Sequence, residues 1–176
     1  MKLFDTIREA GGGRIVAALA AKAGIGPDAA EEALRALLPE IGHAIRRMEE
    51  SGSGAAVVSA AMHDERYARY LERPEALAEP AAVDDGEAVL ADVLDDDERS
   101  DLIRRVAAEI GPDESEVRDL LPLVAALAMA ALGQKLHGSS PGLPWFGSRP
   151  GDRLDAPLLN ALTALFEQDD EGPKDR

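Results

Sequence analysis

One pattern occurs twice in this chain of 176 residues. It reads Ile-Gly-Pro-Asp, then a helical stretch that closes on Leu-Leu-Pro, and the copies span residues 25–39 and 110–122. A glycine typically ends a helix, and a proline followed by an acid begins the next one. The pattern therefore predicts two homologous three-helix repeats, at about 11–50 and about 86–136. The residues given structural roles in these turns and helices are Gly26, Pro27, Pro39, Gly111, Pro112 and Pro122.

Each copy carries a proline inside its second, longer helix, which we predict over residues 27–48 and 113–136. A proline has no N–H to donate and crowds the carbonyl four residues earlier. We expect Pro39 and Pro122 to kink these helices so that they wrap round a common core and cross near the prolines. The two freed carbonyls are an alternative ligand contact, but no other candidate residue converges on them.

Composition favours helices throughout the chain. Hydrophobic residues make up 45% and aromatic residues only 3%, and alanine and leucine, the strongest helix formers, dominate the apolar set. We therefore predict an all-α, multihelical bundle of about seven to nine helices. Residues 120–132 are apolar on nearly every side, which is typical of a helix at the centre of a bundle.

Glycines and prolines mark the other boundaries. Gly11-Gly12-Gly13 ends a short opening helix. The alternative is that the backbone N–H groups of these glycines and Arg14 bind an anion at the start of the next helix. A helix follows over residues 55–71, after which Pro74 and Pro80 bracket at most one helical turn. We expect Asp84-Asp85-Gly86 to begin the next helix.

The chain divides into a duplicated domain, a linker and a C-terminal segment. The domain covers residues 1–137 and a turn-rich linker 138–153. Residues 154–168 form an amphipathic helix that docks peripherally or exchanges with a neighbouring copy, and residues 169–176 are a charged tail.

Trp145 and Phe146 lie in this linker among glycines and prolines. They either staple the last helix onto the bundle or contact a partner. We favour stapling, because single apolar side chains often lie exposed without a role.

Charge and composition exclude several functions. The net charge of −15 and the absence of a basic cluster argue against nucleic-acid binding. Without cysteine there is no disulfide or thiolate chemistry. The longest uncharged apolar run, residues 120–133, is too short to span a membrane. The start of the chain lacks an apolar signal-peptide core, so we expect a cytoplasmic protein.

The acidic run at residues 95–101, together with His63, is the candidate metal or small-molecule site of an enzyme. The run lacks the spacing of a calcium loop, and acids are favoured at a helix start in any case. His63 has no second histidine three or four residues away. Tyr67 and Tyr70 are three residues apart on one helix face, with Arg66 and Arg69 beside them. We expect the tyrosines to pack under the loop at residues 74–80, and a small binding surface is the alternative.

Several ordered motifs resemble the YidB-like family, a bacterial domain family of unknown function. They are residues 69–90, from Arg-Tyr-Leu-Glu-Arg-Pro to Asp-Asp-Gly-Glu-Ala-Val-Leu, the opening Leu3-Phe4-Asp5, both Leu-Leu-Pro motifs and residues 121–133. The resemblance covers roughly residues 1–136 and implies a multihelical fold without an established activity, substrate or catalytic residue. The chain departs from relatives at residues 90–95, where a histidine and a Phe-Gly pair are missing, and in lacking their glycine-rich tail.

These features together favour a non-enzymatic interaction or assembly module. We expect no cofactor, and a protein partner or second copy that binds through residues 138–168. The alternative is the enzyme that uses residues 95–101 with His63.

Overall fold

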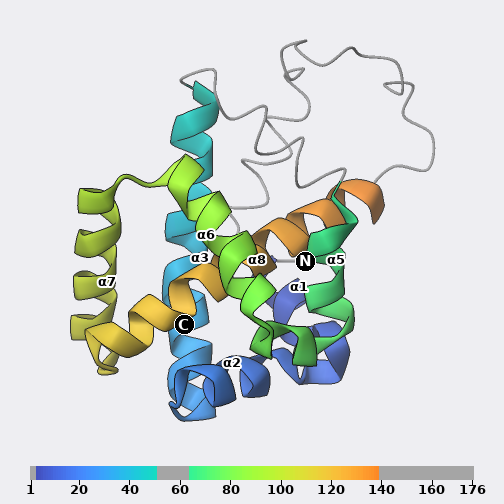
Figure 1. Cartoon of the computed structure of the whole chain (residues 1–176), viewed down its shortest axis with the longest axis horizontal. Coiled ribbons are helices and arrows are strands. Elements are labelled where there is room, and N and C mark those ends of the chain that lie inside the picture. The colour runs from blue at the N-terminus through green and yellow to red at the C-terminus, as the bar shows by residue number, and fades with distance from the viewer. Residues whose placement is uncertain (1–2, 51–63, 139–176) are drawn as a thin grey trace, which may run out of the picture.

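The computed structural model of the protein describes residues 3–50 and 64–138, and the regular structure in these stretches is entirely helical (Figure 1). The predicted all-α fold is confirmed for this part of the chain. The predictions for residues 55–63, for the linker and for the C-terminal segment lie outside it. The elements in chain order are α1 (Leu3–Glu9), η1 (Ala10–Gly13), α2 (Ile15–Ala23), α3 (Pro27–Glu50), α5 (Glu65–Glu72), η2 (Pro74–Ala78), α6 (Pro80–Val93), α7 (Asp96–Ile110) and α8 (Glu114–Gly138), where η denotes a 3-10 helix.

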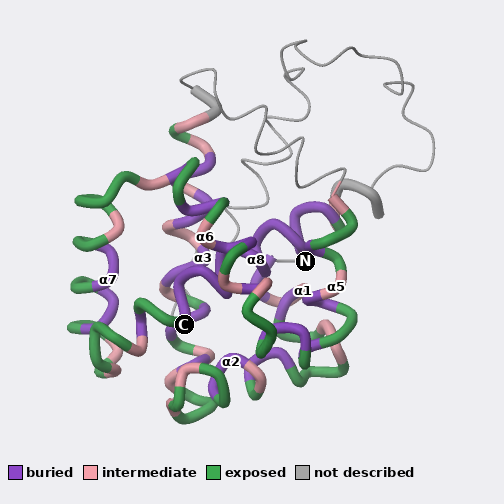
Figure 2. Tube along the Cα trace, viewed as in Figure 1, coloured by how far each residue is buried: buried purple, intermediate pink, exposed green. Residues whose placement is uncertain are grey.

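Helix α8 is the centre of the bundle. It contacts α1, α2, α3, α5, α6 and α7, and residues 120–133 are all buried. Figure 2 shows the buried residues concentrated on α8 and on the inward faces of its neighbours, while α7 at one edge exposes its outer face. A helix that is apolar all round needs neighbours on every side, and the expectation for residues 120–132 is confirmed. None of the described helices is both long enough and apolar enough to cross a membrane.

The predicted turns after α2 and α7 are present, but in the first copy the glycine that ends the helix is Gly24, two residues before Gly26. Gly24 ends α2 and Gly111 ends α7, with left-handed φ angles of 74° and 91°. Each N–H donates back to a carbonyl of its helix, as is usual for a glycine cap. Pro27 is the first residue of α3, after Gly26, whose carbonyl accepts from Ala30 N–H at 3.0 Å. In the second copy, Pro112 precedes α8, which begins at Glu114.

Three successive glycines make the turn between α1 and α2. Gly11, Gly12 and Gly13 have φ angles of 60°, 70° and 77°, a conformation that costs other residues about 1 kcal/mol each. A β-carbon on Gly11 would also lie 2.3 Å from Cγ of Pro74 at the start of η2. The turn therefore ends the first helix, as predicted, and packs against a segment far away in the sequence.

Both internal prolines lie inside uninterrupted helices. Pro39 is half-buried in α3 and Pro122 is buried in α8, and the two helices are in contact. Gly86 of α6 lies close against the Pro122 backbone, which the sequence pattern does not indicate.

The predicted start of the next helix at Asp84-Asp85-Gly86 is wrong. Helix α6 begins at Pro80, because proline suits the first position of a helix as well as it suits a turn. Gly86 is buried in the interior of α6. A β-carbon there would lie 1.8 Å from the carbonyl oxygen of Pro122, so the glycine serves the close packing of α6 on α8.

Candidate functional site

Asp85 is the one charged side chain buried in the core of the described residues, with 9% of its surface exposed. The burial of Asp85 results from the packing of α6, because the neighbouring Gly86 contacts α8 while Asp85 faces α5. A buried carboxylate without partners is strongly destabilising. The partners of Asp85 therefore decide whether the position is structural or chemical.

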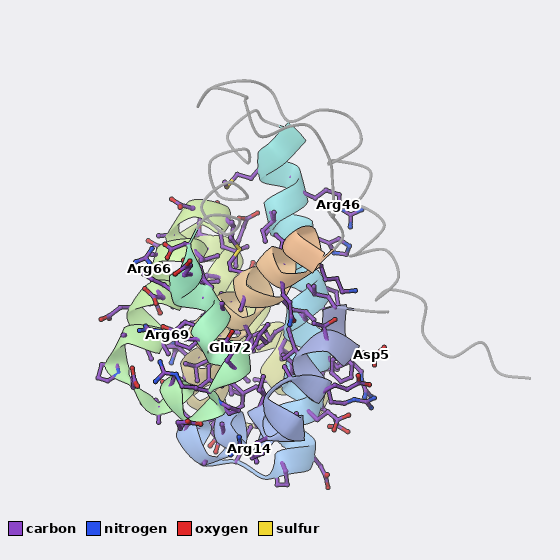
Figure 3. All side chains as sticks on the ribbon, turned by 90° about the vertical axis from the view of Figure 1, so that its right-hand side faces the viewer. Asp5, Arg14, Arg46, Arg66, Arg69 and Glu72 are labelled. Carbon is purple, nitrogen blue, oxygen red and sulfur yellow. The ribbon has the colours of Figure 1, made fainter. Side chains whose placement is uncertain are left out.

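Three side chains of α5 contact the Asp85 carboxylate. The Tyr70 hydroxyl donates to Oδ2 at 2.5 Å, and Arg69 Nη2 donates to the same oxygen at 3.2 Å. Arg66 Nη1 donates to Oδ1 at 3.4 Å. Arg66 and Arg69 lie along the side of α5 toward α6 (Figure 3). We call these residues, with Asp64, the Asp85 cluster.

Local sequence explains how α5 presents these groups. Asp64 caps the helix by accepting from the Arg66 N–H at 3.0 Å. Tyr67, Tyr70 and Leu71 are buried at helical spacing, which directs one face of α5 to the core. Arg66 Nε also donates to Asp64 Oδ2 at 2.6 Å, so its guanidinium joins the start of α5 to Asp85. The expectation that Tyr67 and Tyr70 pack inward is confirmed.

Burial and hydrogen bonding shift the pKa values of Tyr70, Asp64 and Arg69 in the Asp85 cluster. Burial, reinforced by the hydrogen bond to Asp85, raises the pKa of Tyr70 to about 12. The hydrogen bond from Arg66 lowers the pKa of Asp64 against the effect of its own burial. The hydrogen bond to Tyr70 raises the pKa of Arg69. At neutral pH the phenol is therefore a proton donor to Asp85, and the arginines carry full charge.

Asp85 and Tyr70 form their hydrogen bonds with other members of the Asp85 cluster. Both Asp85 oxygens accept hydrogen bonds, and the Tyr70 hydroxyl donates to one of them while it accepts from Arg69 Nη2 at 2.5 Å. The arrangement holds α5 against α6 and, through the adjacent Gly86, both helices against α8.

Further ion pairs connect α7 to its neighbours. Arg99 donates to Glu87 of α6 through its two terminal guanidinium nitrogens, Nη1 to Oε2 at 2.6 Å and Nη2 to Oε1. On the surface, Arg47 and Glu40 of α3 pair with Glu98 and Arg105 of α7 at 2.9 and 3.0 Å. Exposed pairs of this kind contribute about 0–1 kcal/mol each, so α7 is held mainly by its buried apolar face.

The acidic run begins helix α7. Asp95 Oδ1 accepts from the Glu98 N–H at 2.8 Å, and Glu98 Oε2 accepts from the Asp95 N–H at 3.2 Å. This reciprocal capping box satisfies two N–H groups that a helix start leaves free. Within residues 3–50 and 64–138 no three histidine, aspartate or glutamate side chains are grouped to hold a metal ion. His63, the other half of the metal hypothesis, lies outside those residues, as do Trp145 and Phe146.

The Asp85 cluster is not predicted from the sequence. The pattern favours packing for Tyr70, with a small binding surface beside Arg66 and Arg69 as the alternative, and it assigns Asp85 to a helix start. A signal was present, because Arg66, Arg69 and Tyr70 recur at spacings of three and four on one helix face. Such a face of cations and a phenol predicts a buried acid opposite, without indicating which acid.

Comparison with known proteins gives one match. Residues 5–135 match the model of a family described as "Bacterial protein of unknown function (DUF937)". No similar protein was found among curated proteins, and none among solved structures. The matched range includes the whole Asp85 cluster and ends within α8.

Proposed function

This chain belongs to that bacterial family of unknown function, the YidB-like family, and we propose that it acts as a non-enzymatic interaction or assembly module. Family membership supplies no activity, so the proposal is argued from the residues. The observation that carries it is the Asp85 cluster, in which the buried Asp85 carboxyl group and the Tyr70 hydroxyl are held by hydrogen bonds to other members of the cluster, while Arg69 Nε is buried without a partner. Such a cluster stabilises one packing of helices and leaves recognition to the surface or to attached segments.

We further propose that the helical bundle in residues 1–137 consists of two homologous repeats. The contacts support it, because α2 packs on both α3 and α8, and α7 packs on both α8 and α3. Each short helix therefore bridges the two long ones. Both short helices end on a left-handed glycine, Gly24 and Gly111, although the glycine that aligns with Gly111 in the repeat is Gly26.

The partner binds, in our proposal, to residues 138–168. The family match ends at residue 135 and α8 ends at Gly138, so this segment is an addition to the shared domain. Its sequence carries an apolar stripe at helical spacing and the aromatic pair Trp145 and Phe146. Aromatic side chains supply much of the binding energy at protein interfaces. A second copy of the chain or another protein fits this chemistry.

Light scattering tests the proposal on three forms of the protein: the full chain, residues 1–138, and the full chain with Trp145→Ala and Phe146→Ala. A double variant with Ser148→Ala and Arg149→Ala in the same linker is the matched control. If a second copy is the partner, we expect a concentration-dependent mass above the monomer for the full chain and the control. The aromatic variant should be a monomer with undiminished helical circular dichroism, and the truncated form should be a monomer that loses no more helical signal than residues 154–168 account for.

If the full chain is itself a monomer, the same four forms are used as bait in native lysate. A protein retained by the full chain and the control, but lost by the other two forms, supports recognition by this segment. Identical masses together with identical captured proteins for all forms would refute the role of residues 138–168.

A further inference from the structure

We draw no further inference here: the strongest candidate, the left-handed Gly11–Gly13 turn at the N-terminus of α2 with the exposed Arg14 beside it, is a helix N-terminus for which no second observation in the described residues points to an anionic ligand.

Discussion

Gly86 and Pro122 bring the backbones of α6 and α8 into direct contact, since a β-carbon on residue 86 would lie 1.8 Å from the Pro122 carbonyl oxygen. Backbone atoms of a packed helix cannot yield as a flexible side chain does. Asp85, the residue before Gly86, contacts Arg66, Arg69 and Tyr70 of α5, so the contact between α6 and α8 is adjacent to the Asp85 cluster. Three helices are thus fixed relative to one another by two adjacent residues of α6.

Replacing Gly86 by alanine should destabilise the protein. Within a helix this change ordinarily stabilises by about 1 kcal/mol, but here the added methyl group forces α6 away from α8. We expect a net loss of roughly 1–3 kcal/mol, as for overpacked cores, measured by urea unfolding. The matched control is Ala91→Gly, on the exposed side of α6, which should cost about 1 kcal/mol by helix propensity alone. A Gly86→Ala variant as stable as the parent would contradict the close contact.

Replacing Asp85 by asparagine should loosen α5. The change leaves Arg66 and Arg69 without their shared carboxylate, and we expect a loss of about 3 kcal/mol, the low end for a broken buried pair, because both arginines are partly exposed. Hydrogen exchange should quicken in α5 before it quickens in α3. Tyr70→Phe should cost about 2 kcal/mol by losing a hydrogen bond to a charged group. Additive losses in the double variant would show that Tyr70 and Asp85 do not interact.

Stability should fall at alkaline pH because of Tyr70. Its pKa is about 12 in the folded protein against about 10 for an unperturbed tyrosine. The folded state thus holds this proton more tightly. The stabilisation is fully present below about pH 10 and is lost as pH rises toward 12. Urea unfolding followed from pH 9 to pH 12 should show the decline.

Two single variants assign this alkaline decline to a residue. Burial also raises the pKa of Tyr67, so the Tyr67→Phe variant should keep the part of the decline that belongs to Tyr70. The Tyr70→Phe variant should lose that part. The same slope in Tyr70→Phe as in the parent would assign the effect to other groups.

The acidic run should behave as a helix cap. Asp95→Ala removes the capping box of α7, and we expect a loss of about 1 kcal/mol that is the same with and without added Ca²⁺ or Zn²⁺. The control Asp97→Ala changes an exposed acid in the first turn of α7 and should cost less. A melting temperature raised by either ion in the parent, and not in Asp95→Ala or His63→Ala, would favour the metal site instead.

Local patterns predicted what depends on neighbours in sequence. The glycines at 24 and 111 end helices because their own backbone adopts a left-handed conformation, and the central position of α8 follows from its composition. The Asp85 cluster joins Tyr70 and Asp85, which are 15 residues apart on separate helices. The spacing of residues along one helix does not show which face of another helix it will contact. Gly86 was misassigned because glycine serves both turns and close helix contacts, and only the neighbouring helix distinguishes the two.

The position of α8 in the chain also bears on how the protein is made. The ribosome releases α1, α2, α3, α5, α6 and α7 before the helix that every one of them contacts. Until residues 114–138 emerge, those helices have no common surface to cover, and their apolar faces stay open to the surroundings. Nascent chains in that condition are prone to aggregate. The core of this domain is therefore completed only when its last helix has been synthesised, and the six earlier helices cannot reach their final packing before then.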